Sequence, residues 1–249
     1  MTLAAIAATA ATPRPSGETL QEQAQRAGWG ITAQLANPVL ATRGTWQLKW
    51  LALSPDNANL VYIAWNSDGS NQIAVVVRGT VDNPTDTMED LDVGTVVPFT
   101  AGGSANVAVS TGAMAAFTQV ATACGITEFS AEQSSAGGSG QPDTVVPSGT
   151  TVAQALAALL APLPSTPQPV VHVTGHSLGG CIATMLATYL QAQTWTPNSP
   201  QFALVTFAAP TAGLQSFADY VGSLPWASNQ RHINAYDLVP LAWSDLTAA

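Results

Sequence analysis

The sequence is poor in charge, and above all in positive charge. Only 8% of its 249 residues are charged, its single lysine is Lys49, and the formal net charge at pH 7 is −9. No cluster of Lys and Arg occurs anywhere along the chain. Because binding to nucleic acids or to anionic membrane surfaces depends on such clusters, neither is an expected partner. An uncharged, apolar substrate fits this composition better.

Cysteine and histidine are also scarce. The two cysteines, Cys124 and Cys181, are too few for a disulfide framework, and we interpret them as buried free thiols. No metal-ligand spacing occurs among these cysteines and the three histidines, so we expect no metal and no cofactor.

Long hydrophobic runs are missing as well. The Ala/Thr-rich stretch 1–12 is too short to cross a membrane and lacks the basic start of a signal peptide, and no other run reaches membrane-spanning length. We therefore predict no integral membrane segment and a flexible N-terminus over residues 1–16. The sequence does not identify a compartment, although an extracellular location is favoured.

What the sequence does contain is enough apolar material for a large core. Apolar residues make up 47% of the chain, and its length suits one large α/β domain. The loosest stretch, residues 128–148, is rich in Gly and Ser, and we interpret it as a surface insertion. The prediction is a single domain over residues 17–249 and a monomer.

The order of the predicted elements indicates the fold class. Strands at 45–53, 60–65 and 73–77 are joined by short turns, which is typical of antiparallel pairing. Beyond residue 100, strands alternate with helices, which indicates a parallel sheet. These later elements are helices at 110–123, 151–160, 181–193 and 214–221, and strands at 170–174, 202–207 and 231–234. We therefore predict a mostly parallel central sheet flanked by helices, with antiparallel strands at its N-terminal end. A capping box at Thr19 and Glu22 predicts a further short helix, ending near Ala27.

One short stretch carries the chemistry. Residues 170–174, all β-branched except His172, precede Gly175-His176-Ser177-Leu178-Gly179, and a helical run follows. Strand, G-x-S-x-G and helix together are the context of a nucleophile elbow, whereas the pattern alone also occurs by chance. The glycines leave room for the backbone in such a turn. The turn aims the first N–H groups of the helix at whatever the serine attacks.

Four motifs, in this order, resemble the fungal-type (class 3) lipase family of the α/β-hydrolase fold. They are Val75-Val76-Val77-Arg78-Gly79-Thr80, Val173 to Gly180, Thr206-Phe207-Ala208-Ala209-Pro210, and the segment Arg231 to Pro240 around Asp237. The resemblance implies a serine ester hydrolase of the lipase or esterase type, acting on ester or lipid substrates through an acyl-serine. It implies that Ser177 is the nucleophile, that Leu178 and Thr80 form the oxyanion hole, and that Asp237 is the triad acid. Thr80 also fits a strand-end cap, and Asp237 also fits an Asx-turn before Val239-Pro240.

The chain departs from this family at the triad histidine. In this fold the order is Ser, Asp, His, but His172, His176 and His232 all precede Asp237. We interpret His172 as a core residue, His176 as pointing away from the serine, and His232 as a strand residue. The favoured interpretation is a C-terminally incomplete sequence whose general base lies on missing residues, which would leave this chain nearly inert. The alternatives are an unusual base, or a catalytically dead acyl-binding or structural module.

The segment expected to form the lid predicts the kind of substrate. Residues 81–94 contain five acidic residues and few large apolar ones, and resemble the polar lid of fungal feruloyl esterases more than a lipid-facing lid. This favours short-chain or soluble esters over bulk triglyceride. A solvated acidic loop without a substrate role is the other interpretation. A serine thioesterase or acyltransferase is a related alternative that product analysis would separate.

Overall fold

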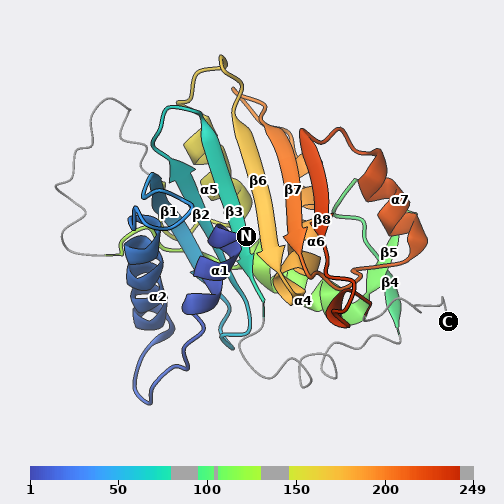
Figure 1. Ribbon diagram of the computed structural model, residues 1–249, viewed down its shortest axis with the longest axis horizontal. Helices are drawn as coiled ribbons and strands as arrows, with labels where there is room; N and C mark the ends of the chain where they lie inside the picture. The colour runs from blue at the N-terminus through green and yellow to red at the C-terminus, as the bar shows by residue number, and fades with distance from the viewer. Residues whose placement is uncertain (80–94, 104–105, 130–145, 242–249) are drawn as a thin grey trace.

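The computed structural model describes residues 1–79, 95–103, 106–129 and 146–241. Its centre is a six-stranded sheet in the order β1-β2-β3-β6-β7-β8 (Figure 1). The strands are β1 (Trp46–Leu53), β2 (Leu60–Asn66), β3 (Gln72–Arg78), β6 (Val170–His176), β7 (Gln201–Phe207) and β8 (Ser228–His232). β1, β2 and β3 pair antiparallel with one another, and β3, β6, β7 and β8 pair parallel, so β3 belongs to both parts. The predicted mixture of antiparallel and parallel strands is confirmed.

The larger core fills the face of the sheet on which α6 lies. It contains side chains of α4 (Thr111–Thr122), α5 (Val152–Leu160), α6 (Leu178–Gln191) and α7 (Gln215–Ser223). Alternate strand residues such as Val75, Val77, Val171 and Val173 point into it, as the two-residue period of a strand requires. A short hairpin of β4 (Val96–Pro98) and β5 (Ala108–Ser110) lies beside α7 (Figure 1). This core therefore holds the elbow helix α6 against β3, β6 and β7.

A second, smaller core lies on the opposite face, beneath α1 (Thr2–Thr9) and α2 (Leu20–Leu35). Intervening strand residues such as Tyr62, Ala74 and Val76 point into it, together with Ile6 and Ile31 of the two helices. Figure 1 shows α2 in front of this face near β1 and α1 in front of it near β3. With both faces of β3 covered, its residues 73–77 are all apolar, and its place between β2 and β6 confirms the predicted central position.

The structure differs from the sequence-based prediction at the N-terminus. Thr2–Thr9 form a helix whose Ile6 and Ala7 are buried, and the Tyr62 hydroxyl donates to the Leu3 carbonyl oxygen at 2.8 Å. The prediction of a flexible N-terminus over residues 1–16 was therefore wrong for this part. The physical reason is tertiary: the apolar face of the sheet stabilises a helix that is too short to be stable alone.

Two element boundaries also differ. The capping box at Thr19 is present, but α2 continues to Leu35 rather than ending near Ala27. The last strand spans Ser228–His232 rather than residues 231–234, because its backbone pairs with Ala203–Phe207 of β7. Its side chains are mostly exposed, so no buried apolar pattern marks this strand in the sequence.

The buried face of α1 yields a test of this correction. We expect Ile6→Ala to lower the free energy of unfolding by about 2 kcal/mol, because a buried aliphatic side chain is lost from the second core. The exposed Ala8 of the same helix provides the control, and Ala8→Ser should change stability by less than about 0.5 kcal/mol. Urea denaturation followed by circular dichroism measures both. Equal, negligible effects of the two substitutions would mean that α1 does not contribute to the core.

Candidate active site

Ser177 lies in the sharp turn between β6 and α6. Its backbone angles are φ 55° and ψ −133°, in a region that non-glycine residues rarely adopt. The turn is fixed from both sides, since the Ser177 N–H donates to the Phe207 carbonyl oxygen at 2.9 Å and the Gly180 N–H donates to the Ser177 carbonyl oxygen at 2.8 Å. The side chain is half-buried. Strand, strained serine and helix follow one another as the G-x-S-x-G pattern predicts.

The glycines around Ser177 allow three backbone segments to meet. A Cβ atom on Gly175 would lie 2.1 Å from the Gly179 carbonyl oxygen, and one on Gly179 would lie 2.5 Å from the Val77 carbonyl oxygen. Both distances are far below a van der Waals contact. The turn therefore closes only because Gly175 and Gly179 have no side chain, and the end of β3 packs directly on the start of α6.

Leu178 is the first residue of α6, and its side chain is buried. The N–H groups of the first helical turn have no acceptor within their own helix, and the helix dipole makes this end favourable for negative charge. The Leu178 N–H is thus available to an oxygen anion formed on a substrate at Ser177. A Cβ atom on Gly79 would lie 3.7 Å from the Leu178 nitrogen, so the residue before Thr80 adjoins this N–H. Thr80 itself lies outside the described residues, as does the acidic segment 81–94.

Asp237 lies in the turn that follows β8. Its Oδ1 accepts from the Val239 N–H at 3.0 Å, and its own N–H donates to the Asn234 carbonyl oxygen at 3.0 Å. This is the Asx-turn that the sequence also allowed, and the carboxylate is half-buried. Parallel strands β6, β7 and β8 all end at one edge of the sheet, so Ser177 and Asp237 follow strands that end at this edge.

Arg231 is a residue to which the sequence assigned no role of its own. Its Nη2 donates to the Ala209 carbonyl oxygen at 2.8 Å and to the Pro240 carbonyl oxygen at 2.9 Å. It therefore ties the turn after β7 to the loop that carries Asp237. The only sign of this structural role in the sequence was that Arg231 lies in the fourth motif, the segment Arg231 to Pro240.

The three histidines lie apart from a triad arrangement. His172 pairs with Ala74 and Ala203 on the face opposite α6, and partial burial lowers its pKa. His176 is exposed at the end of β6, and His232 stacks on Phe207 with ring centroids 5.0 Å apart. Within the described residues, none of the three forms a hydrogen bond to Ser177 or Asp237; His232 contacts Gln230 instead.

The two cysteines lie in different surroundings. Both are free, Cys181 buried and Cys124 exposed, so the expectation that both are buried was wrong for Cys124. Cys124 lies at the surface because it follows the end of α4 in the connection to the bridge at Ile126. Burial raises the pKa of the Cys181 thiol to about 12, which keeps it protonated one turn beyond Ser177. Among the residues described, no three His, Cys, Asp or Glu side chains cluster as a metal site would need.

The elbow yields a pair of matched substitutions. We expect Gly175→Ala to lower the free energy of unfolding by more than about 3 kcal/mol or to prevent folding, because its methyl group would overlap the Gly179 carbonyl oxygen. Gly30 in α2 has no atom within 4 Å of an added Cβ, so Gly30→Ala should stabilise the protein by about 0.5–1 kcal/mol. Thermal unfolding of both variants checks this. A Gly175→Ala protein as stable as wild type would show that the elbow is less closely packed than described.

Solved structures of lipases share this arrangement of strands and helices. The crystal structure of M37 lipase superposes with a TM-score of 0.71 at 19% identity, covering 97% of this chain and 67% of that one. Lipase II from Rhizopus niveus gives 0.57 at 21% identity, over 96% of this chain and 72% of that one. A triacylglycerol lipase whose catalytic centre is formed by a serine protease triad gives 0.58 at 20% identity, over 96% and 71%. These likenesses establish the α/β-hydrolase fold predicted from the sequence.

The sequence itself matches a family. No curated protein matches the chain, and no helix in its described part is long and apolar enough to cross a membrane. The sequence model for the family described as Lipase (class 3) matches residues 74–245, which include the end of β3, the elbow and the Asp237 loop. This match spans more than half of the 249 residues, so the chain belongs to the class 3 lipase family.

Proposed function

We propose that this member of the class 3 lipase family hydrolyses carboxylic esters through an acyl intermediate on Ser177. The observation that carries the proposal is the strained turn at Ser177, which places a serine hydroxyl at the N-terminus of α6. A turn with φ 55° at a serine is costly, and such strain occurs mainly at functional sites. The triad described for the triacylglycerol lipase of the same fold supports the same chemistry.

The reaction follows from the groups at this turn. The Ser177 oxygen attacks the ester carbonyl carbon, its proton passes to a general base, and the carbonyl oxygen becomes negatively charged. The Leu178 N–H and the N–H and hydroxyl of Thr80 are proposed to stabilise that charge, each donor lowering the barrier by roughly 3 kcal/mol. Expulsion of the alcohol, which takes up the proton, leaves the acyl-serine. Water then attacks this ester and releases the acid.

Asp237 is proposed to orient the catalytic base and to stabilise its cation. Arg231 and the Asx-turn at Val239 hold its loop at the edge of the sheet where β6 ends. The Asx-turn occupies Oδ1, which leaves Oδ2 for a second donor. The loop geometry therefore suits an acid whose position is fixed by its own loop and does not depend on contact with the base.

We propose that none of the three histidines of this chain is the general base. Three features support this: His172 lies on the opposite face of the sheet, His176 is exposed, and His232 is stacked on Phe207. Without a base, a serine hydroxyl is a weak nucleophile at neutral pH, so turnover by this chain alone should be slow.

Added imidazole tests both the nucleophile and the origin of the base. We expect imidazole to raise the Ser177-dependent hydrolysis of p-nitrophenyl butyrate by about tenfold or more, because it can take the serine proton as the missing side chain would. The rate is followed at 405 nm, and the Ser177→Ala protein under the same imidazole gives the background to be subtracted. Ser223→Ala, an exposed serine on α7, serves as the matched control and should behave as wild type.

Each other outcome of this experiment has a definite meaning. Fast hydrolysis without imidazole that is lost in a His172, His176 or His232→Gln variant would place the base within the chain. No difference from Ser177→Ala under any condition would contradict the hydrolase and favour the acyl-binding or structural module. In a protein that has a base tethered near Asp237, Asp237→Asn should weaken catalysis. In the present chain, Asp237→Asn should leave the response to free imidazole within about threefold of wild type. Asp219→Asn on α7 is the control and should change neither.

The substrate class is proposed from the composition of residues 81–94. Their five acidic residues disfavour a lid that opens onto lipid, so short-chain or soluble esters are the proposed substrates. We expect imidazole-assisted kcat/KM to fall by at least about tenfold from p-nitrophenyl butyrate to the palmitate ester. The rate on tributyrin should show no jump when the substrate passes its solubility limit. Strong activation at that limit, measured by pH-stat titration, would instead indicate a lipid-facing lid.

A further inference from the structure

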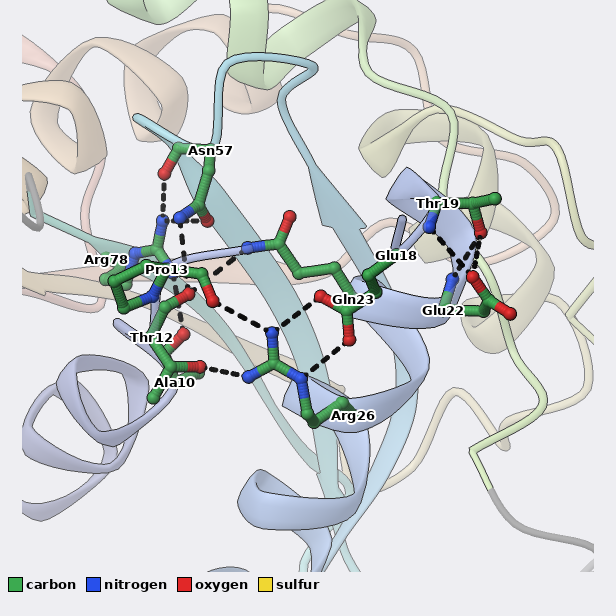
Figure 2. A network of polar contacts seen from close by, with 10 residues as sticks. All are labelled: Ala10, Thr12, Pro13, Glu18, Thr19, Glu22, Gln23, Arg26, Asn57 and Arg78. Atoms are coloured by element: carbon green, nitrogen blue, oxygen red, sulfur yellow. Dashed lines mark hydrogen bonds and ion pairs between the residues drawn. The ribbon is translucent and has the colours of Figure 1, made fainter. Parts of the chain in front are cut away.

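Arg78 is the last residue of β3, and its side chain is only 2% exposed. Its guanidinium donates to the carbonyl oxygen of Ala10 at 3.1 Å and to the carbonyl oxygen and Oδ1 of Asn57 at 2.5 and 3.3 Å (Figure 2). The Nε has no partner among the described residues. A charged side chain from the sheet is thus held by neutral oxygen atoms from two other parts of the chain.

This arrangement is expensive in stability. No carboxylate forms an ion pair with Arg78 within the described part, where the one ion pair joins Arg26 to Glu18. Burial lowers the pKa of Arg78 to about 10, so the charged form is disfavoured where it lies. Apolar side chains of similar volume commonly stabilise such positions better than a buried charge does. Stability alone therefore does not account for an arginine here.

The acceptors of Arg78 belong to well-fixed elements. Ala10 is the C-cap of α1, where free carbonyl oxygens and the helix dipole favour a cation. Asn57 lies in the turn between β1 and β2, with φ 63°. The other end of α1 is held by the Tyr62 hydroxyl, which donates to Leu3. Side chains of β2 and β3 therefore hold α1 at both ends.

The segment after α1 is held as well. Arg26 of α2 donates to the Thr12 hydroxyl, to the Pro13 carbonyl oxygen at 3.2 Å, and to Glu18 at 2.8 Å. The Thr12 carbonyl oxygen accepts from Gln23 at 3.2 Å and from Asn57 at 3.4 Å. Figure 2 shows both arginines reaching this segment from different sides. Residues 10–13 thus form a fixed support for the Arg78 guanidinium.

On the side of the active site, the Arg78 backbone meets the elbow. A Cβ atom on Gly179 would lie 2.7 Å from the Arg78 carbonyl carbon and 2.6 Å from the Gly79 nitrogen. A Cβ atom on Gly79 would lie 3.0 Å from the His176 carbonyl oxygen. The Arg78–Gly79 peptide is therefore packed on the turn that presents Ser177, and it immediately precedes Thr80.

We propose that Arg78 is a positioning residue for the oxyanion hole, holding the end of β3 against the nucleophile elbow by anchoring it to the C-terminus of α1 and to the β1–β2 turn. The inference rests on the proposed function, because Thr80 and Leu178 form that hole only in an ester hydrolase. It gives the N-terminal segment 10–13 a part in catalysis, through its contact with Arg78. A displacement of about 1 Å at such a position is enough to lower a rate by about a hundredfold.

Kinetics of Arg78 variants test the proposal. In the imidazole-assisted assay, Arg78→Met should lower the Ser177-dependent kcat by about tenfold or more and change KM by less than about twofold, since the donors stabilise the transition state and not the bound ester. Arg78→Lys keeps a charged donor for one of the two carbonyl oxygens and should restore part of kcat. Ile31→Ala, in α2 and in the same core, removes buried apolar surface without touching these bonds. It should lower the melting temperature but leave kcat unchanged.

Hydrogen–deuterium exchange supplies a readout that needs no turnover. Arg78→Met should speed exchange both in residues 10–13 and at the start of α6, whereas Ile31→Ala should not speed exchange at the start of α6. If wild type shows no Ser177-dependent hydrolysis, the proposed function fails, and the exchange data alone report whether Arg78 links α1 to the elbow. If hydrolysis is present and Arg78→Met retains the wild-type kcat, the positioning role is wrong. A loss of kcat matched by Ile31→Ala would likewise overturn it, since general destabilisation would explain both.

Discussion

The arrangement of this molecule depends on one close backbone approach, where the end of β3, the turn at Ser177 and the start of α6 meet without intervening side chains. Gly175 and Gly179 make the approach possible, because any Cβ atom there would lie within 2.5 Å of a carbonyl oxygen. The approach has two consequences that cannot be separated. It holds Ser177 in its strained conformation, and it brings the N-terminus of α6 beside the strand that leads to Thr80. The same contact therefore sets the position of Ser177 and that of the N-terminus of α6 beside it.

The parallel half of the sheet extends this geometry toward Asp237. His176, Phe207 and His232 lie side by side at the ends of β6, β7 and β8, so the loops after these strands leave the sheet at one edge. Ser177 begins the first of those connections and Asp237 lies in the last. The register of these three strands thus brings the connections that carry Ser177 and Asp237 to the same edge of the sheet.

How far the sequence predicts this structure differs from one feature to another, for physical reasons. β3 is visible in the sequence because its residues 73–77, covered on both faces, are all apolar, and β6 because residues 170–174 are β-branched except for His172. The elbow is visible because its close backbone approach requires glycine at two positions. α1 is not, because an Ala/Thr-rich octapeptide has no helical pattern of its own and is stabilised by Tyr62, Arg78 and the face of the sheet. β8 is misplaced by three residues at its start for a similar reason, since it is set by pairing with β7. Two of the three acceptors of Arg78 are backbone carbonyl oxygens, one of them 68 positions away, and every residue has such a group, so the sequence does not single them out.

Arg78 also shows how stability and site geometry oppose one another in this fold. Its pKa of about 10 is below the ordinary value of 12.5, so between these pH values the unfolded chain holds a proton that the folded chain has released. Stability contributed by this group consequently rises with pH in that interval, and below it the whole cost of burying the charge is present. An apolar side chain would avoid the cost, but it could not reach the carbonyl oxygens of Ala10 and Asn57 with directed bonds. What the guanidinium adds is a set of directed hydrogen bonds, which join the end of β3 to the C-terminus of α1 and to the β1–β2 turn. At neutral pH the buried charge of Arg78 lowers the stability of the fold. The same side chain holds the Arg78–Gly79 segment in position, and this segment packs against the turn at Ser177.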